Sequence, residues 1–425
     1  MEQSLFVQFA AFFKAIAKDL VERVNGKKTP LTYLHKEMLT KELSTDLKWQ
    51  TLNVDGSVVS ADVVAMDSAL PLKKRDSFGT ASGDIPKLGM KLSLNEKTMS
   101  DIDVLQARNV ETKILVGKIF ADTTKSLLGI YEKLEFMFLQ GLSTGLTLVD
   151  DDTNVGSGIR VNYGYPAANK FGAVKPWSDS TSKPIDDIKR IIKQAKSKGN
   201  VLSVLMMDEA TFDNLAMNQQ TREQYAFSQN FVGSQIPVPD IDQVNTMLQK
   251  RYKLSIIIVD RTVVTERDGV RTIQTPWAAN TVVFLQNTKV GKLVYGILAE
   301  ETRPNKSVMY EKADGFILLK KWHQSEPFAE FTSSQALALP VISNVDSIYL
   351  LDTEEAAVDA QTEGDANFDY EGTSYTKQSV VDALKLAKPT SKLTIASTDA
   401  KLLDAINALS EEQILVFEAN IVEAV

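Results

Sequence analysis

The stretch SDIDVLQARNVETKILVGKIFADTTKSLLGIYEKLEFMFLQGLSTG, from Ser100 to Gly145, sets the expected fold of this chain. Ser100 can cap the start of a helix, two aspartates suit its first turn, and Gly145 suits its end. At ~1.5 Å per residue the helix would be on the order of 60 Å long, and Gly117 and Gly129 leave open a bend into two collinear pieces. Apolar residues recur every three or four positions, as in an amphipathic helix: Ile102, Leu105, Val110, Ile114, Ile119, Phe120, Leu127, Ile130, Leu134, Met137, Phe138 and Leu142.

The composition excludes several classes of functional site. The 425 residues include no Cys, which excludes disulfides, thiolate nucleophiles, zinc fingers and iron–sulfur clusters. The two histidines, His35 and His323, are far apart in the sequence and lack a partner motif, so we expect surface or packing residues and not catalysts. The formal net charge of -8 argues against dedicated nucleic-acid binding. With 44% hydrophobic residues, the chain is expected to form two or three domains.

Residues 1–48 predict an N-terminal helical arm. Apolar residues between Leu5 and Val24 have helical spacing, but charged residues interrupt them, so no run is long enough to span a membrane. Glu2 stands where a signal peptide would be basic, and no small-residue cleavage site follows. We therefore expect an amphipathic helix that packs on protein, with a membrane-surface helix as the alternative. After a break at Asn25, a second short helical pattern runs to about Leu47.

Residues 49–97 predict an extended loop of two strands. Strand-like runs cover Trp49 to Met66 and Ile85 to Leu94, and the second leads directly into the long helix. The connection from Asp67 to Asp84 is polar and includes the triplet Lys73-Lys74-Arg75. A two-stranded ribbon with little core is marginal in water, so this one needs a surface to lie on. For the triplet we expect a solvated tip or a contact with a neighbouring subunit, with nucleic-acid contact as the alternative.

From residue 177 onward, helices and strands mix without a regular βαβ repeat, so we expect an α+β fold and not a doubly wound sheet. Helices are predicted over Pro184–Gly199, Asp208–Met217 and Asp240–Tyr252. Strands are predicted over Val201–Met207, Ser255–Val259, Thr281–Leu285, Lys292–Ala299, Phe316–Trp322 and Ser347–Leu351. Asp268-Gly269 is expected to turn a hairpin.

The last part of the chain, residues 352–425, predicts an acidic linker and a small appended domain. Between Asp352 and Asp369 lie five further acidic residues and no basic residue, as in a solvated linker. Phe368 to Tyr375 predicts a hairpin, and Ser410 with Gln413 forms a capping box at the start of a helix. The helix and strand order resembles small nucleic-acid-binding modules, an alternative that the many carboxylates disfavour.

No residue is assigned to a catalytic, cofactor-binding or metal site, and no enzyme activity is predicted. The glycines near Ser157 lack the lysine and the strand–helix context of a phosphate-binding loop, and no GxSxG motif occurs. The acidic pairs Asp186-Asp187 and Glu300-Glu301 could be imagined as acid/base pairs. Adjacent side chains on a helix or strand point in different directions, so we expect solvated faces instead.

Several motifs, taken in order, resemble the major capsid proteins of tailed bacteriophages, specifically the lambda head-protein (E) family. The resemblance covers roughly Trp49 to Leu351. Each motif alone is weak, and their ordered combination is specific. The motifs are Leu134-Glu135-Phe136-Met137 with Gln140 to Gly145, Val161 to Pro166, Trp177-Ser178-Asp179 with Pro184 to Ile188, Tyr295-Gly296 with Ala299-Glu300, and Pro327 to Glu330 with Leu339-Pro340.

The resemblance implies a Hong Kong 97-type capsid fold with a small C-terminal α+β appendage. The extended loop would lie across a neighbouring subunit, and the axial domain would meet its copies around five- and six-fold axes. Residues 1–48 and 352–425 fall outside the pattern, and their roles stay open. The implied parts are the extended loop at 49–97, the spine helix and peripheral domain at 98–176, the axial domain at 177–301 and the return strands of the peripheral domain at 302–351.

The implied function is mechanical. Copies of the chain would assemble through pentamers and hexamers into an icosahedral virion head around phage double-stranded DNA, contacted non-specifically on the inner face. The implied partners are the chain itself, a portal protein, a scaffold and a decoration protein, without a membrane, and assembly would take place in the bacterial cytoplasm. The acidic balance fits, because a strongly cationic wall would hold DNA at many points. An encapsulin-like nanocompartment shell is the alternative, and a soluble hydrolase is a remote one.

Overall fold

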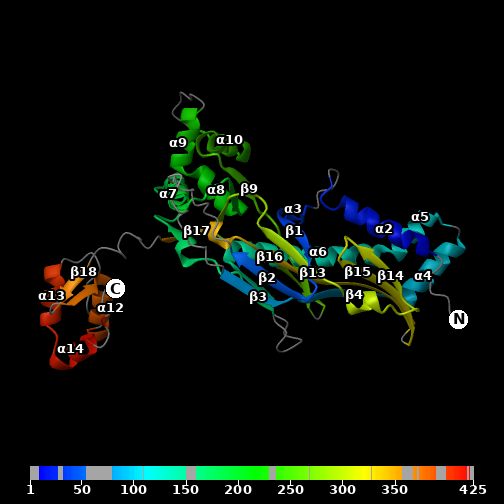
Figure 1. Cartoon of the computed structure of the whole chain (residues 1–425). Coiled ribbons are helices and arrows are strands. Elements are labelled where there is room, and N and C mark those ends of the chain that lie inside the picture. The colour runs from blue at the N-terminus through cyan, green and yellow to red at the C-terminus, as the bar shows by residue number, and fades with distance from the viewer. Residues whose placement is uncertain are drawn as a thin grey trace, which may run out of the picture. The chain divides into compact units, whose positions relative to one another are not determined.

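The structure is a computed structural model (Figure 1). It forms two compact units, Met1–Glu355 and Ala356–Val425. The structure describes residues 9–26, 32–53, 79–108, 110–149, 159–228, 236–267, 269–326, 328–356, 367–370, 373–388, 399–418 and 421.

The stretch predicted as one long helix forms three consecutive helices, so the prediction of a continuous rod is wrong. Asn95 caps the first helix, because its Oδ1 accepts hydrogen bonds from the Thr98 backbone N at 3.0 Å and Oγ1 at 2.8 Å. The helix therefore begins before Ser100. Gly145 ends the last helix as predicted, with φ of 79° and its N donating to the Gly141 carbonyl. The three helices are α4 (Glu96–Ala107), α5 (Thr112–Ile119) and α6 (Ala121–Thr144).

The breaks between these helices lie near Glu111 and at Phe120, and not at Gly117 or Gly129. Glu111 is extended, with ψ of 128°, and Phe120 has φ of -103° and ψ of 7°. The buried Phe120 ring stacks on Phe13 at a centroid distance of 6.1 Å. The glycines lie inside helices, where neighbouring residues hold the helical conformation. Tertiary packing, which hydrophobic spacing does not encode, therefore decides where the spine bends.

The largest sheet within the described residues has six strands and lies against α6 (Figure 1). The apolar face of α6, including Leu127, Leu134 and Phe138, is buried on this sheet. The Ser334 hydroxyl donates to the Ser126 carbonyl at 2.7 Å, which joins helix and sheet through a buried hydrogen bond. The strands are β1 (Leu39–Leu43), β13 (Gly291–Gly296), β16 (Phe328–Ile342), β15 (Ile317–Ser325), β14 (Met309–Ala313) and β4 (Lys87–Asn95).

Strand β16 organises this sheet. Its 15 residues pair with β4 along one edge, from Ala329 to Leu337. Along the other edge it pairs first with β15 and then with β13, whose Gly296 faces Leu337. The position of β4 directly before α4 confirms the predicted extended run that leads into the helical stretch. Its predicted place in a two-stranded ribbon is wrong, because β4 pairs with β16, and the run from Trp49 pairs instead with residues 79–84 of the predicted connection.

The N-terminal segment contributes two helices and a strand to this body. They are α2 (Ala10–Arg23), α3 (Leu34–Met38) and β1, which pairs parallel to β13 with Leu39 opposite Gly291. The amphipathic helix predicted before Val24 is confirmed over its described part. The second helical pattern ends at Met38 and not near Leu47, because pairing with β13 holds the following residues in a strand.

A second, five-stranded sheet has four helices on one face. Residues of that face, including Leu205, Ile256 and Phe284, form a core with the helices, whereas Met206 and Val283 join the core around α6. In this sheet β8 pairs in parallel with β9, whereas β12 pairs antiparallel with both β8 and β17, which confirms that the fold is not doubly wound. The strands in spatial order are β7 (Lys170–Ala173), β17 (Tyr349–Ala356), β12 (Thr281–Leu285), β8 (Val204–Met207) and β9 (Ser255–Ile258).

The helices on this face begin and end largely where capping residues predict. Pro184 occupies the first turn of α7, and Asp240 with Gln243 forms a capping box at the start of α10. The third helix of the group, α9, was not predicted; Asn218, with ψ of 139°, separates it from α8. The helices are α7 (Pro184–Ser197), α8 (Glu209–Met217), α9 (Gln219–Ser228) and α10 (Ile241–Tyr252). Short elements elsewhere are α11 (Ala299–Thr302), η1 (Ala167–Asn169) and η2 (Val345–Ser347).

Three two-stranded ribbons complete the first unit. Gly269, with φ of 77°, lies in the predicted hairpin turn between β10 and β11, while Asp268 falls outside the described residues. The remainder of the extended loop, residues 54–78 with the basic triplet, and the glycines near Ser157 also lie outside them. The ribbons are β2 (Lys48–Asn53) with β3 (Gly79–Asp84), β5 (Leu146–Val149) with β6 (Ile159–Asn162), and β10 (Val263–Arg267) with β11 (Val270–Gln274).

The second unit has its own apolar core, including Phe368, Val380, Leu402 and Phe417. The predicted hairpin is confirmed, and Ser410 and Gln413 exchange the hydrogen bonds of the predicted capping box. The predicted linker is wrong in its first residues, because β17 continues to Ala356 and buries Thr353. The elements are β18 (Asn367–Tyr370), β19 (Thr373–Thr376), α12 (Lys377–Ala387), α13 (Asp399–Asn407) and α14 (Glu411–Glu418).

Candidate functional site

The acidic pairs considered as acid/base groups do not converge. Asp186 is half exposed and binds Lys189, whereas the buried Asp187 accepts a hydrogen bond from the Trp177 indole at 3.1 Å and pairs with Arg190. A lysine hydrogen bond lowers the pKa of Asp186 from its ordinary value. The carboxylates at positions 300 and 301 bind Lys320 and Lys312, respectively. In each pair the two carboxylates therefore bind different partners, and each contact stabilises the local structure.

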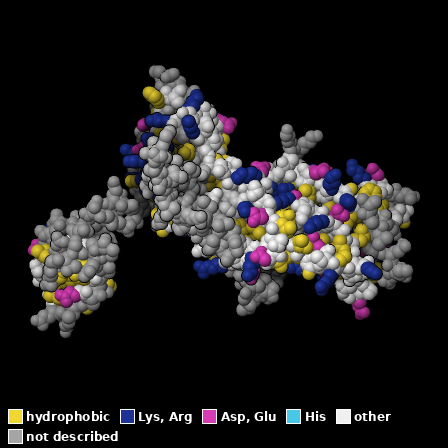
Figure 2. All heavy atoms as spheres, viewed as in Figure 1, with side chains coloured by type: hydrophobic (Ala, Val, Ile, Leu, Met, Phe, Trp, Pro, Cys, Tyr) yellow, Lys and Arg dark blue, Asp and Glu magenta, His cyan; other side chains and the backbone are white. Residues whose placement is uncertain are grey.

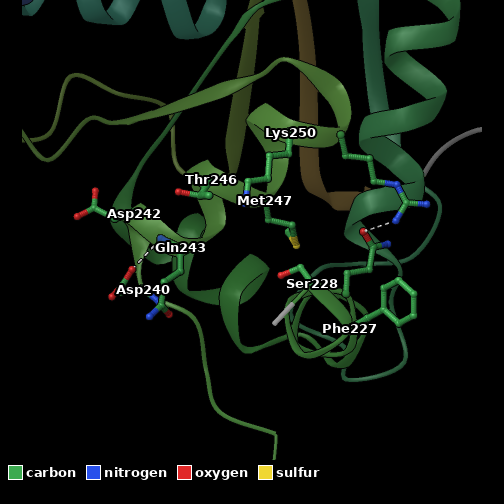
Figure 3. A pocket seen from close by; sticks show the side chains of 10 residues that line it. Phe227, Ser228, Asp240, Asp242, Gln243, Thr246, Met247 and Lys250 are labelled. Carbon is green, nitrogen blue, oxygen red and sulfur yellow. Dashed lines mark hydrogen bonds between the residues drawn. The ribbon is translucent and has the colours of Figure 1, made fainter. Parts of the chain in front are cut away.

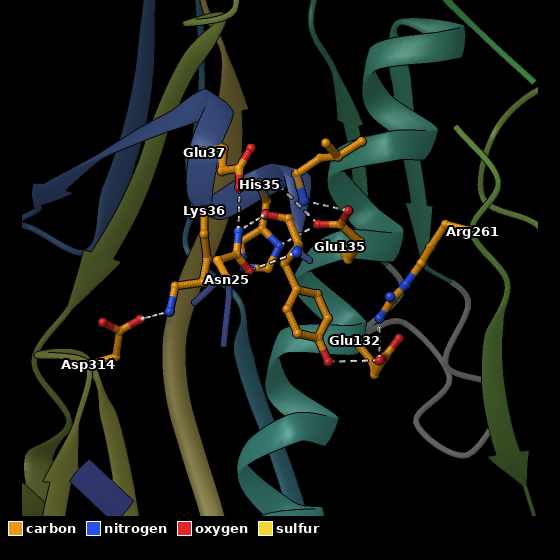
Figure 4. A network of polar contacts seen from close by, with 10 residues as sticks. Asn25, His35, Lys36, Glu37, Glu132, Glu135, Arg261 and Asp314 are labelled. Atoms are coloured by element: carbon orange, nitrogen blue, oxygen red, sulfur yellow. Dashed lines mark hydrogen bonds and ion pairs between the residues drawn. The ribbon is translucent and has the colours of Figure 1, made fainter. Parts of the chain in front are cut away.

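His35 is a buried packing residue. Its Nδ1 lies 2.6 Å from Oε2 of Glu135 on α6, and both side chains are almost completely buried (Figure 4). The same carboxylate accepts hydrogen bonds from the backbone N of Leu34 at 2.8 Å and of His35 at 3.0 Å. Glu135 thus satisfies the first backbone donors of α3 and fixes the N-terminal segment on α6.

A second group of contacts lies one turn along α6. Glu132 accepts a hydrogen bond from the Tyr33 hydroxyl at 2.8 Å and pairs with Arg261 at 2.5 Å (Figure 4). The Arg261 guanidinium lies 4.6 Å from the centre of the Tyr33 ring. Burial, followed by the Glu132 charge, raises the pKa of Tyr33, so this hydroxyl stays a neutral donor. The contacts join the N-terminal segment, α6 and the chain leaving β9.

Lys321 is the most unusual buried cation of the described residues. Its Nζ donates to Thr332 Oγ1 at 2.7 Å and lies 4.7 Å from the centre of the Phe120 ring. Burial lowers its pKa to about 7, although the charges of Asp122 and Glu330 act in the opposite direction. This lysine lies beside the rings of Phe13 of α2 and of Phe120, which is a packing position.

A groove of about 450 Å³ lies between α9 and α10 (Figure 3). Its polar side chains serve the neighbouring helices: Asp240 and Gln243 form the capping box of α10, and Arg251 reaches Gln224 at 3.5 Å. The Phe227 ring stands beside the groove and is 86% exposed. The groove therefore has an exposed apolar rim, and several of its polar groups are already engaged, which suits a surface contact better than catalysis.

The first unit exposes apolar side chains among charges of both signs (Figure 2). Phe227 at the groove is exposed, as is Val238, and the β10–β11 ribbon exposes Val264, Val270 and Ile273. Among the described residues, no group of three or more His, Cys, Asp or Glu side chains could hold a metal ion. In that same part of the chain, no helix combines the length and the apolar character needed to cross a membrane.

Sequence reasoning missed the residues that join the chain segments: Tyr33, Glu132, Glu135 and Arg261. A signal for one of them was present, because Glu135 lies between Leu134 and Met137 on the buried side of α6. A carboxylate at a core position requires a hydrogen-bonding or charged partner. Its partners are about 100 residues away in the sequence, so spacing alone could not identify them.

Comparison with known proteins connects this architecture to a family. The model of a family described as phage major capsid protein E matches residues 17–352. No curated protein matches the sequence. The structure resembles the crystal structure of a putative capsid protein of a prophage from E. coli CFT073, with a TM-score of 0.50 and 16% identity over 78% of this chain and 96% of that chain.

Two further solved structures are similar at lower scores. A phage-related protein from Bordetella bronchiseptica RB50 has a TM-score of 0.46 and 13% identity, over 80% of this chain and 97% of that one. A capsid chain of cyanophage A-1(L) has a TM-score of 0.44 and 10% identity, over 77% and 94%.

Proposed function

This chain belongs to the phage major capsid protein E family and is a structural protein of the capsid shell, and we propose that its copies assemble through pentamers and hexamers into an icosahedral head around phage double-stranded DNA. The family match over residues 17–352 carries this conclusion. It places the chain in the virion capsid and favours the phage shell over an encapsulin-like compartment. A family of shell proteins self-assembles, so the first partner of each subunit is another copy of itself.

Each of the two large sheets corresponds to one proposed domain of the capsid subunit. The six-stranded sheet with α6 would form the peripheral domain, and the five-stranded sheet with α7 to α10 would form the axial domain, which meets its copies around the symmetry axes. Such rings use head-to-tail contacts that close when the rotation allows. The β2–β3 ribbon packs on its own subunit through the buried Trp49, and the extended loop that it carries would lie across the neighbouring subunit.

The other proposed partners are a portal protein, a scaffold, a decoration protein and the packaged DNA, with assembly in the bacterial cytoplasm. Charge supports non-specific DNA contact on the inner face. Residues 356–425 contain 12 Asp and Glu against 5 Lys and Arg, a formal charge of -7 out of the -8 of the whole chain. The remaining 355 residues are nearly neutral, so a wall formed by them would neither repel DNA strongly nor hold it at many points.

A structural role also agrees with how the ionisable side chains of the described residues are used. His35 holds the N-terminal segment, Asp186 and Glu300 bind lysines, and Asp187 binds Arg190. Family and fold are those of a structural protein. Among the described residues, these ionisable groups form no arrangement that favours the remote alternative, a soluble hydrolase.

Electron microscopy of the purified full-length chain, with and without coexpressed scaffold, tests the proposal. We expect closed shells with five- and six-fold clusters of subunits. The genes beside the coding sequence should include a portal and a terminase, which separates a phage head from a nanocompartment. A protein that remains monomeric under both conditions would contradict the proposed shell.

A further inference from the structure

The β10–β11 ribbon is an isolated two-stranded element with a defined pattern of side chains. Val264 lies opposite Ile273, and Glu266 lies opposite Arg271. Since side chains alternate along a strand, these four residues share one face, while Val270 lies on the other. Within the described residues, the two strands pair with each other and with no third strand.

The ribbon exposes large apolar side chains on both faces. Val264 is 58% exposed and Ile273 is 72% exposed on the first face, and Val270 is 66% exposed on the second. All five residues of β11 are exposed. Burial of such side chains is favourable, and an isolated ribbon is only marginally stable in water. Both facts favour a ribbon that is covered by a partner.

The base of the ribbon is fixed on the rest of the subunit. Val263 is buried, and Arg261 just before it is held by Glu132 of α6. After the ribbon, Trp277 is buried with its indole N donating to the Thr281 carbonyl at 3.1 Å, and the Ala278 backbone N donates to the Ser143 hydroxyl at 3.0 Å. The apolar tip is therefore presented from a rigid base, which lowers the entropic cost of a contact.

We propose that the β10–β11 ribbon is an assembly contact that packs against a neighbouring copy of this chain. The inference rests on the proposed function, since in a shell each subunit is surrounded by other copies. Charge identifies the same partner. Glu266 and Arg271 pair at 2.8 Å on the face of Val264 and Ile273, which makes that face neutral. DNA or an anionic membrane would select a cationic face, whereas a neutral apolar face suits an identical copy, whose first 355 residues are nearly neutral.

Cysteine labelling tests this contact directly, because the chain has no native Cys. The variant Ile273→Cys is reacted with a small maleimide, once as free subunits and once as shells assembled from the purified chain alone. We expect labelling to be at least tenfold slower in shells. The control is Leu386→Cys in the second unit, a site 61% exposed, which should react at the same rate in both states.

A second variant separates contact from folding. Val264→Thr with Ile273→Thr keeps β-branched residues, so the ribbon keeps its strand propensity while losing apolar surface. For the double variant we expect an unchanged melting temperature of the free subunit and at least a tenfold lower yield of shells. The single variant Ile273→Val keeps an apolar side chain and should give the normal yield of shells.

The outcomes distinguish this inference from the proposed function. If the unmodified chain forms shells, equal labelling of Ile273→Cys in subunits and shells would overturn the ribbon contact and leave the capsid function intact. Protection that appears only when DNA or vesicles of anionic lipid are added would also overturn it, because the partner would not be a second copy. A chain that forms no shells contradicts the proposed function first, and the ribbon contact with it.

Discussion

Oε2 of Glu135 lies 2.6 Å from Nδ1 of His35, although 100 residues separate the two in the sequence. The contact is buried, and the same carboxylate binds the first two backbone N–H groups of α3. One side chain of the spine therefore fixes the path of the N-terminal segment.

Replacing this carboxylate should destabilise the subunit strongly. Glu135→Ala leaves two backbone donors and the His35 ring without their acceptor in a buried site, so we expect a loss of about 3–5 kcal/mol. The matched control is Glu37→Ala, whose carboxylate makes an exposed hydrogen bond to Asn25 and should cost under about 1 kcal/mol. Urea unfolding of both variants measures the difference; similar midpoints would show that the buried contact contributes little.

Lys321→Met should stabilise the subunit at neutral pH. Burial lowers the lysine pKa to about 7 in the fold, below its unfolded value of 10.5, so the folded state binds the proton less readily. The resulting penalty is complete below about pH 7 and disappears as the pH rises through 10.5. At ~1.4 kcal/mol per pKa unit the gain is a few kcal/mol, partly offset by the lost hydrogen bond to Thr332.

The measurement for Lys321→Met is the difference in melting temperature between variant and parent at pH 6.5 and at pH 10. The difference should be positive at the lower pH and smaller at the higher pH. Lys193→Met, at an exposed position of α7, is the control and should show neither effect. A gain for Lys321→Met that is independent of pH would show that burial of the charge is not its cause.

Proline substitutions should reveal where the spine is broken. At Leu127, inside α6, proline removes a helix hydrogen bond and clashes with the preceding turn, which costs about 3 kcal/mol or more. Thr112 is the first residue of α5 and follows the extended Glu111, so proline there should be nearly neutral. Thermal unfolding and soluble yield compare the two variants, and equal losses would mean that the helix continues through residue 112.

The extended loop should be needed for assembly and not for folding. Asn53 and Gly79 face each other at the end of the β2–β3 ladder, so residues 54–78 can be replaced by the two-residue turn Asn-Gly. We expect the melting temperature of the free subunit to be unchanged and closed shells to be absent, because the loop would lie on a neighbour. Shells of normal size and yield from this variant would refute that role.

The second unit should be dispensable for shell assembly when the chain is truncated after the end of β17. A chain ending at Ala356 keeps that strand, and it should assemble normally. A chain ending at Asp352 loses the buried Thr353, whose carbonyl accepts the Trp177 backbone N–H at 2.9 Å, and it should be less stable. Particle imaging and thermal unfolding distinguish the two truncations. Failure of the longer chain to assemble would make residues 357–425 part of the lattice.

Much of the fold could be predicted from local signals. The bounds of β12 agree with the prediction, and α7 and α10 begin at their predicted proline and capping box. The family was recognisable because short motifs recur in order along the chain, even though the structural neighbours share few residues with it. These features depend on nearby residues or on sequence order, which the sequence displays directly.

Features that depend on distant partners could not be predicted. β16 contains polar residues that hide a buried strand, because Ser334 bonds to Ser126 and Thr332 accepts a hydrogen bond from Lys321. Residues 39–43 have helical spacing, and only pairing with β13 makes them a strand. The contacts of Glu135 and Arg261 likewise appear only when the segments meet. No spacing rule identifies such tertiary partners.

The long strand β16 has a mechanical consequence. Its 15 residues extend about 50 Å; β15 and then β13 pair along one edge, while β4 pairs along the other edge opposite β15. A force along the strand axis would be transmitted through the covalent backbone of β16 and would load its interstrand hydrogen bonds in shear. Many of these hydrogen bonds would therefore have to break at the same time. The six-stranded sheet is thus stiffest along β16, and a shell loaded from within should yield between its subunits before this strand is torn from its neighbours.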